Sequence, residues 1–343
     1  MSPRRNVSWR LALALAFSSM PLSVAFAQTS DEFYRGKTIS IIVGVAPGGS
    51  FDLYARLAAR HLGSHVPGKP QVIVKNMAGA GGLTALNYFA QVAPRDGTTL
   101  NMPPPALGLM QLLGQSGIQY DARKFNWVGR LTSISQVFYT WTNSPTRSLA
   151  ELRARDTTLG GTGATADATT FANLLNDLVG TKFKIIQGYN DTGSVMLAME
   201  RGEVEGTIRP WEGMKSGRER VWMAEKQINL VTLIATQRHA ELPDLPAVME
   251  LATTEEQRRM LRLFFSVADI GRSLALAADT PKERVATLRA AFASMLGDPA
   301  FQEDARRQDT PITTASGDDL AAMIETAFQS TPEEIEVARK YQH

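Results

Sequence analysis

A near-continuous apolar stretch, residues 39–45, stops at a Pro-Gly-Gly turn and continues at once as a helical pattern over 52–62. Such a run predicts a buried strand, and the two glycines allow a tight turn directly before the helix. The same order of strand, glycine-rich turn and helix recurs along the chain. This repetition limits the fold most, because it is typical of α/β domains with largely parallel sheets.

The predicted elements fall into two sets, with the second set beginning near residue 135. We expect strands at 38–45, 71–75, 98–102, 137–142, 157–159, 183–186, 204–209 and 230–235. We expect helices at 52–62, 83–93, 168–178, 191–201, 282–296, 298–308, 317–326 and 331–341. The sequence has no long linker between the two sets. We therefore expect two closely joined α/β lobes, an arrangement that allows more than one crossing of the chain.

Three glycine-rich turns, 46–50, 79–82 and 160–165, each come directly before a predicted helix. In open α/β sheets ligands bind beyond the carboxyl ends of the strands, which is where these turns lie. The start of a helix offers backbone N–H groups and the positive end of a dipole, and both suit an anion. Together the turns predict one cleft for a small acid. For any single turn, the alternative is that its glycines serve close packing alone.

The first 27 residues are predicted to be a secretory signal peptide, with an arginine-rich start, an apolar middle and an Ala-x-Ala site that ends at Ala27. Three of the 36 basic residues lie in this segment, which leaves 33 basic against 34 acidic residues in the 316 that follow. A nearly neutral chain has no basic field for nucleic acid or a membrane surface. We therefore expect a periplasmic protein that does not bind nucleic acid.

Several reactive sites are excluded or weakly supported. The chain has no cysteine, so a thiol nucleophile, a thiol redox site and a cysteine-ligated metal are impossible. His61 and His65 have the spacing of a helical metal pair, but an exposed helix end is the favoured reading. Residues 161–166 fit a dinucleotide fingerprint that lacks its later acidic partner. We therefore expect no metal, no cofactor and no catalytic residue.

A series of motifs resembles the substrate-binding proteins of tripartite tricarboxylate transporters, often called the Bug family. The opening turn with Asp52 and Arg56 matches the family's first motif. Further blocks follow in the family's order: Pro70–Asn76 leading to Gly79–Gly82, Pro94–Leu100, Tyr120-Asp121, Ser148–Leu152, Glu200–Val204, Leu242–Pro246 and Thr280–Glu283. The resemblance extends from Asp31 to about Thr326 and rests on the order and spacing of these blocks together.

The resemblance implies a type II periplasmic binding protein, in which two α/β lobes enclose a small carboxylate. Lobe 1 would comprise residues 28–135 and 263–343, and lobe 2 residues 136–262. The protein would act as a monomer and deliver its ligand to the membrane permease subunits of the transporter. Carried over from the family or placed beside its turns, the expected ligand-binding residues are Ala46, Pro47, Gly48, Gly49, Ser50, Gly81, Gly82, Pro104, Thr162, Gly163, Ala164 and Thr165.

Two further residues are candidates on physical grounds. Arg209 follows a lobe-2 strand and could hold a carboxylate, and Trp211 could close an apolar side of the pocket. The alternatives are a surface arginine and a packed tryptophan. Asp52 is expected to pair with Arg56 at the start of its helix rather than to contact ligand. Arg272 is expected near the return crossing, as a hinge residue.

The function predicted from these patterns is capture rather than chemistry. The ligand would bind the open form and draw the lobes together, since only the closed form offers donors from both. A sensor subunit that docks on a histidine kinase would use the same cleft, and an exported enzyme on the same scaffold is the third class considered. The turn Pro103–Pro105 and Trp211 favour an apolar or aromatic acid as the ligand.

Overall fold

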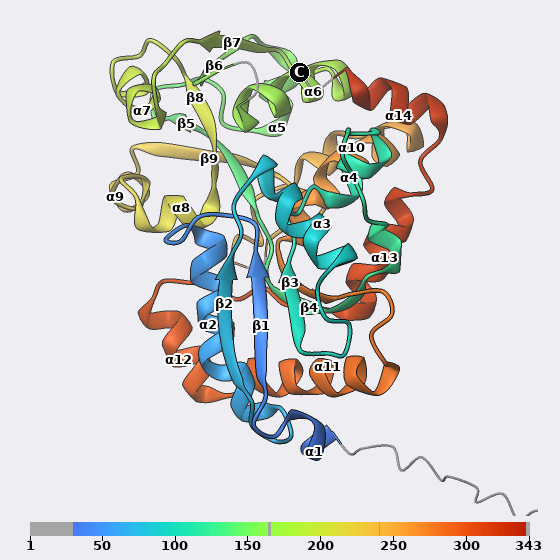
Figure 1. Ribbon diagram of the computed structural model, residues 1–343. Helices are drawn as coiled ribbons and strands as arrows, with labels where there is room; N and C mark the ends of the chain where they lie inside the picture. The colour runs from blue at the N-terminus through green and yellow to red at the C-terminus, as the bar shows by residue number, and fades with distance from the viewer. Residues whose placement is uncertain (1–29, 164–165, 240, 341–343) are drawn as a thin grey trace, which may run out of the picture.

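The computed structural model describes residues 30–163, 166–239 and 241–340. The predicted signal peptide lies outside these residues. Within them the chain forms two separate sheets with helices around each, one sheet above the other in Figure 1. The predicted α/β class and the two-lobed arrangement are confirmed.

The first sheet has the strand order β11-β4-β10-β3-β1-β2. Its parallel half consists of β1 (Thr38–Val43), β2 (Gln71–Asn76) and β3 (Thr99–Met102). The antiparallel half consists of β4 (Asn126–Thr132), β10 (Arg272–Leu276) and β11 (Ala315–Ser316). The expectation of a largely parallel sheet therefore holds for only three of the six strands.

The second sheet has the order β7-β6-β8-β5-β9. Here β6 (Thr157–Gly161) lies parallel to β7 (Phe183–Gln187) and to β8 (Gly206–Pro210). The strand β5 (Gln136–Trp141) is antiparallel to both β8 and β9 (Ile228–Ile234). The second sheet is thus mixed as well.

The helices that pack on and between the sheets have the following bounds: α1 Ser30–Tyr34, α2 Ser50–His65, α3 Leu83–Gln91, α4 Leu107–Leu112, α5 Leu149–Ala154, α6 Asp167–Val179, α7 Thr192–Glu200, α8 Trp211–Ser216, α9 Glu219–Ala224, α10 Glu255–Ile270, α11 Lys282–Leu296, α12 Pro299–Arg307, α13 Gly317–Ala327 and α14 Pro332–Arg339. Single 3-10 turns occur at Ala80–Gly82, Ala122–Lys124 and Val248–Leu251.

The alternation of side chains along β1 explains why helices cover both faces of the first sheet. Ile39, Ile41 and Val43 belong to a core shared with α2 and α11, whereas Ile42 belongs to a core with α3 and α13. Successive strand residues point to opposite faces, so an unbroken apolar run needs cover on both. This packing fixes the carboxyl end of β1, where the Pro-Gly-Gly turn begins.

Two crossings join the sheets, and they lie side by side. The first runs from β4 to β5, and the second runs from α10 through Gly271 into β10. The N–H of Ile134 in the first crossing donates to the carbonyl of Ala268 at 2.9 Å, and Arg272 pairs with Thr132 in the ladder. The chain therefore changes sheets twice at one place, which is the geometry of a hinge.

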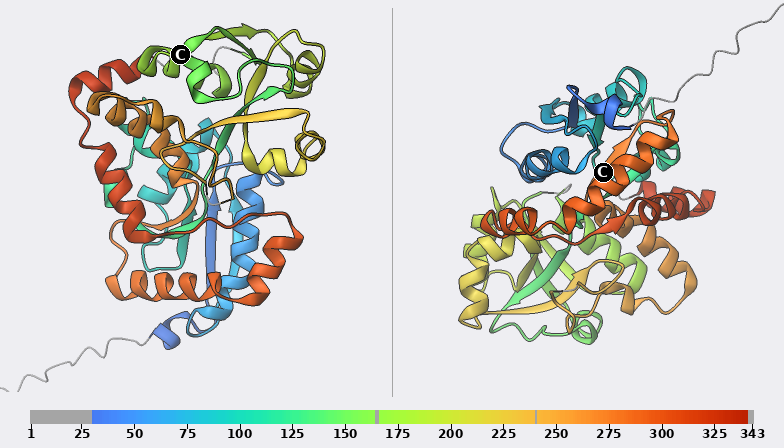
Figure 2. Two further views of the ribbon diagram at one scale, coloured as in Figure 1. Left: turned by 180° about the vertical axis from the view of Figure 1, so that it is seen from behind. Right: turned by 90° about the horizontal axis from the view of Figure 1, so that it is seen from below.

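The C-terminal helices lie along both sheets. In Figures 1 and 2, α13 and α14 rise along one side of the molecule from the level of the first sheet to that of the second. Ala338 of α14 is buried in the same apolar cluster as Phe265 of α10, and Arg259 pairs with Glu334 at 2.6 Å. The predicted lobe boundary at 262–263 falls inside α10, and the assignment of helices to lobes stays a prediction.

Candidate functional site

The turn between β1 and α2 is exposed over all five of its predicted ligand-binding residues, Ala46, Pro47, Gly48, Gly49 and Ser50. A β-carbon added at Gly48 or Gly49 would meet nothing within 4 Å. Gly48 has a φ of +95°, which favours glycine. The space beside these glycines is therefore open, so close packing does not account for them.

The Asp52 carboxylate stabilises this turn through hydrogen bonds. Its side chain accepts hydrogen bonds from the Gly48 N–H at 2.9 Å, from Arg56 Nε at 2.8 Å and from Asn76 Nδ2 at 2.9 Å. Asp52 is only 3% exposed, so these bonds replace its contact with water. The predicted pairing with Arg56 is confirmed. The Gly48 amide is already engaged by Asp52, which leaves the following amides of the turn to face a ligand.

The hydrogen bond from Arg56, with those from Gly48 and Asn76, lowers the pKa of Asp52 to about 2. A lowered folded-state pKa contributes stability above the unfolded value of about 3.9 and loses it as the pH falls toward 2. We expect Asp52→Asn to remove this acid-sensitive contribution. Because Arg56 is half exposed, the effect should be about 1 kcal/mol.

Urea denaturation between pH 7 and pH 2 measures this contribution. The unfolding free energies of the native protein and the Asp52→Asn variant should approach each other as the pH falls from about 4 to about 2. Asp244→Asn, at an exposed aspartate, is the control for the loss of one surface carboxylate. A difference between Asp52→Asn and the native protein that stays constant from pH 7 to pH 2 would contradict the prediction.

The second glycine-rich turn contains one glycine that packs closely against other segments and one that faces open space. Gly82 is buried, and a β-carbon there would lie 3.4 Å from Pro104 Cγ. A β-carbon at Gly44 would lie 2.7 Å from the Gly82 α-carbon, so these two backbones are in contact. Gly81 is exposed and has open space. The structure thus brings Gly82 and Pro104 together by packing, whereas Gly81 is exposed, as are Gly79 and Ala80 before it.

The helices after the three predicted turns lack a side-chain cap. The N-cap residues of α2, α3 and α6, which are Gly49, Gly82 and Ala166, make no side-chain cap hydrogen bond. Six other helices carry a Ser, Thr or Asp cap: α5, α7, α10, α12, α13 and α14. Uncapped N–H groups beside open space are suited to an anion.

In the second lobe, a hollow of about 170 Å³ lies at the carboxyl ends of β6 and β8 and at the start of α6. Thr162 and Arg209, both predicted site residues, line it together with Gln136, Asp167 and Thr207. Gln136 Nε2 donates to Asp167 Oδ2 at 2.9 Å. All of the residues that line it belong to the segment 136–210, so this hollow and the first turn stand as two separate half-sites in this conformation.

The remaining lobe-2 candidates have different surroundings from one another. Gly163 has open space around it, and Ala164 and Thr165 lie outside the described residues. Arg209 is 26% exposed and donates from Nε to Glu219 at 3.2 Å. Trp211 is 7% exposed, packs in the core and donates from Nε1 to Glu241 at 2.7 Å. Trp211 does not line the lobe-2 hollow.

Comparison with known proteins identifies this architecture. The sequence profile of the family described as the tripartite tricarboxylate transporter family receptor matches residues 55–336. The chain belongs to this receptor family. The resemblance inferred from the motifs is therefore confirmed.

Individual relatives agree with this assignment. An Agrobacterium vitis protein, described as a UPF0065 protein in the TAR-I ttuE-ttuC' intergenic region, is 28% identical over 263 residues, 73% of this chain and 72% of its own. A TctC solute binding protein from Polaromonas, solved without ligand, shares 19% identity with a TM-score of 0.68, over 90% of this chain and 98% of that chain. MatC from Rhodopseudomonas palustris with bound malate shares 20% identity with a TM-score of 0.54, over 90% of this chain and 99% of that chain.

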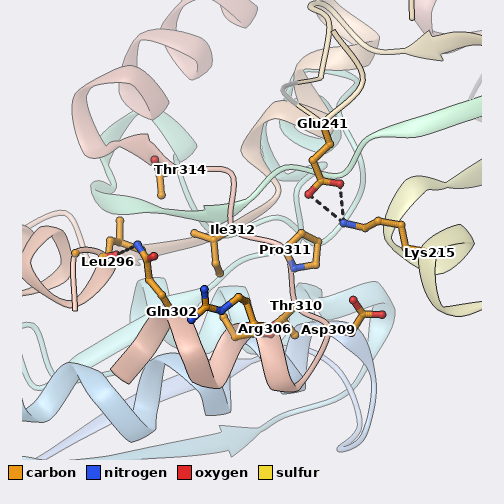
Figure 3. A pocket seen from close by; sticks show the side chains of 12 residues that line it. Lys215, Glu241, Leu296, Gln302, Arg306, Asp309, Thr310, Pro311, Ile312 and Thr314 are labelled. Atoms are coloured by element: carbon orange, nitrogen blue, oxygen red, sulfur yellow. Dashed lines mark hydrogen bonds and ion pairs between the residues drawn. The ribbon is translucent and has the colours of Figure 1, made fainter. Parts of the chain in front are cut away.

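The receptor also has a larger hollow, of about 650 Å³, which Figure 3 shows. It lies between Lys215 and Glu241 on one side and the end of α12 with the segment 309–314 on the other. Glu241 already accepts from Lys215 at 2.8 Å and from Trp211. None of the predicted site residues lines this hollow, so we place the candidate site at the glycine turns despite its smaller volume.

The histidine pair belongs to a helix contact. His61 Nε2 lies 2.9 Å from Asp304 and His65 Nε2 lies 3.0 Å from Asp298, so both histidines join α2 to the α12 region. Their side chains at the end of α2 are only 18% and 16% exposed, which differs from the exposed helix end that was expected. The described residues contain no group of three or more side chains that could hold a metal ion. They also contain no helix long and apolar enough to cross a membrane.

Several residues of the half-sites were not predicted from the sequence. Gln136 lies at the end of the first crossing and Thr207 within β8, and no glycine pattern marks either. Asp167 lies just after the predicted lobe-2 turn, and that position was the one available signal. Arg272, expected only as a hinge residue, donates to the hydroxyl of Ser50 in the first turn at 2.9 Å.

Proposed function

We propose that this receptor captures a small organic carboxylate between its two lobes in the periplasm and delivers it to the permease subunits of a tripartite transporter. The carrying observation is the open space at Gly48, Gly49 and Gly81 beside helices without side-chain caps. Membership of the receptor family supports the transport role. MatC, which has this fold, was solved with malate, and this supports a small acid as the ligand class.

The proposed mechanism uses lobe closure. Lobe 1 offers N–H groups at the start of α2, and lobe 2 offers hydroxyl, amide and guanidinium groups in the hollow that contains Thr162 and Arg209. A ligand that touches both sets binds the closed form more tightly than the open form and shifts the equilibrium toward it. The paired crossings beside Gly271 would serve as the hinge, and the protein would act as a monomer.

Calorimetry tests this proposal with a panel of malate, citrate, adipate, aspartate, glutamate and benzoate. Small-angle scattering on the same samples should show a smaller radius of gyration with the acid that binds. The Ser50→Pro variant removes one backbone N–H at the first position of α2, where proline is tolerated. We expect Ser50→Pro to weaken binding roughly tenfold, since a hydrogen bond to a charged group is lost.

Ser50→Ala separates the loss of the hydroxyl from the loss of the N–H, and it should weaken binding less than Ser50→Pro. Arg153→Gln, on the exposed surface of α5, is the control for a change away from the site. A folded protein that binds no acid in the panel would refute the proposal. Binding without compaction would refute the closure mechanism. Uptake of the bound acid should be lower in cells that lack the receptor than in cells that contain it. Equal uptake would contradict the link to a permease.

A further inference from the structure

Arg272 lies where the two crossings and the first glycine turn meet. It is the first residue of β10, directly after Gly271, and pairs with Thr132 of the other crossing. Its Nη2 donates to Ser50 Oγ at 2.9 Å, and its guanidinium carbon lies 4.1 Å from the centre of the Phe51 ring. The guanidinium is thereby held beside the first two residues of α2.

The guanidinium is incompletely satisfied. Its Nε and Nη1 atoms are shielded from solvent and make no hydrogen bond to any part of the chain that the structure describes. Burial lowers the pKa of Arg272, and the charges of Glu212 and Tyr54 act in the opposite direction. An arginine nevertheless stays charged, and a desolvated charge without hydrogen-bond partners is costly. The position therefore needs a further partner.

The surroundings of Arg272 point to an anion as that partner. Ser50 and Phe51 lie in the first turn of α2, where the helix dipole is positive and the N-cap residue Gly49 supplies no side-chain cap. Asp52 in the same turn is already paired with Arg56, so it does not compensate the charge that Arg272 adds beside the positive end of the helix. One carboxylate at this place would stabilise both charges at once, through hydrogen bonds from the N–H groups and from the guanidinium.

The backbone and the aromatic contact hold Arg272 in place for such a role. Gly271 has a φ of +52°, and a β-carbon there would lie 2.0 Å from the carbonyl oxygen of Thr132. The crossing therefore has little freedom to move Arg272 away. The Phe51 ring lies under the guanidinium and limits its rotation, so that its N–H groups are oriented before a ligand arrives.

We propose that Arg272 is the lobe-1 cation that binds the carboxylate of the captured acid and so determines the receptor's preference for anions. This rests on the proposed function and assigns a named side chain to the site. Glu212, at the start of α8 in the other lobe, acts on Arg272 electrostatically. Its charge opposes a bound anion, so removing that charge should not weaken binding.

Calorimetry with the acid that binds the native protein most tightly in the panel measures the contribution of Arg272. We expect Arg272→Gln to weaken binding by about 10- to 100-fold and Arg272→Lys to fall between this variant and the native protein. Ser50→Ala removes only the contact between Arg272 and the Ser50 hydroxyl, so its loss of affinity should be smaller than that of Arg272→Gln. Arg153→Gln should bind as the native protein does.

Three results would overturn the proposal. The first is binding by Arg272→Gln within twofold of native. The second is a loss in Ser50→Ala as large as that in Arg272→Gln, which would make Arg272 a positioning residue for the turn. The third is an equal loss in Glu212→Gln, because that would show an ion pair between the lobes in place of a contact with ligand. Binding equal to or tighter than native in Glu212→Gln supports the proposal.

A second measurement separates this proposal from the proposed function. In protein labelled with ¹⁵N-arginine, the Nε–H resonance of Arg272 is identified by its absence from Arg272→Lys. Titration with formate, the smallest carboxylate, should shift this resonance saturably, whereas sodium chloride at equal ionic strength should not. Equal responses to formate and chloride refute the role of Arg272 even if an acid of the panel binds. If formate shifts the resonance saturably but no acid of the calorimetry panel binds, the result refutes only the ligand class tested and leaves the role of Arg272 intact.

Discussion

Replacement of Gly271 by alanine is expected to destabilise the receptor by about 3 kcal/mol or more. The φ of +52° is unfavourable for alanine, and the new β-carbon would lie 2.0 Å from the Thr132 carbonyl oxygen and 2.8 Å from the Ser133 α-carbon. Both neighbours are backbone atoms of the other crossing, so neither can rotate away. Relief of the overlap requires the two crossings to separate.

Urea denaturation measures this loss, and Gly297→Ala is the matched control. Gly297 ends α11 with a φ of −82°, and the nearest atom to an added β-carbon lies 3.7 Å away. The control should change stability by no more than about 0.5 kcal/mol. A Gly271→Ala protein as stable as the control would show that the crossings are loosely packed and would remove the basis for a defined hinge.

Replacement of Glu219 by alanine should cost about 3 kcal/mol, the second large effect. The Glu219 side chain is 1% exposed and accepts from Arg209 Nε at 3.2 Å and from the Tyr139 hydroxyl at 3.3 Å. Alanine leaves the Arg209 charge without its buried partner and the Tyr139 hydroxyl without an acceptor. Because Arg209 lines the lobe-2 hollow, the same variant should also change ligand affinity.

Thermal and chemical denaturation of Glu219→Ala, beside Glu219→Gln, tests this expectation. Glutamine keeps an acceptor for Tyr139 but not the charge, so it should lose less stability than alanine. Glu303→Ala removes one member of an exposed pair with Arg306 and should change stability by about 0.5 kcal/mol or less. An effect of Glu219→Ala as small as that of Glu303→Ala would mean that Arg209 is fully solvated.

The parallel parts of both sheets could largely be predicted from the sequence because three of their strands, β1, β2 and β6, are followed by a glycine-rich turn and a helix. The apolar run 39–45 became β1, and the pattern over 52–62 became part of α2. Local sequence determines such units, since the strand, the turn and the helix are neighbours along the chain.

Of the four elements that flank the crossings, β5 was predicted as the strand 137–142, whereas β4, α10 and β10 were not predicted. The strands β4 and β10 are antiparallel and pair with partners more than a hundred residues away, so no local turn marks them. The helix α10 did carry a signal: Thr254 and Gln257 form a capping box in the structure and have its Thr-x-x-Gln spacing in the sequence. That spacing alone predicts the start of this helix.

The candidate site could be located from the sequence more readily than its residues could be ranked. Gly81 and Gly82 are adjacent and identical in the sequence, yet one faces open space and the other packs against Gly44 and Pro104. The difference depends on segments that are distant in the chain. The same reason applies to Arg272, whose contact with Ser50 spans 222 positions and carries no local pattern.

The last helix has a practical consequence. Because α14 lies against α10 through Ala338 and the Arg259–Glu334 pair, and α10 leads directly into a crossing, a rotation of the upper sheet must either carry α14 along or release it. If the proposed closure takes place, a fluorescent label on the exposed surface of α14 would respond to that rotation from a place outside the glycine turns. Helix α14 is thus an attachment point for an optical sensor of the proposed ligand.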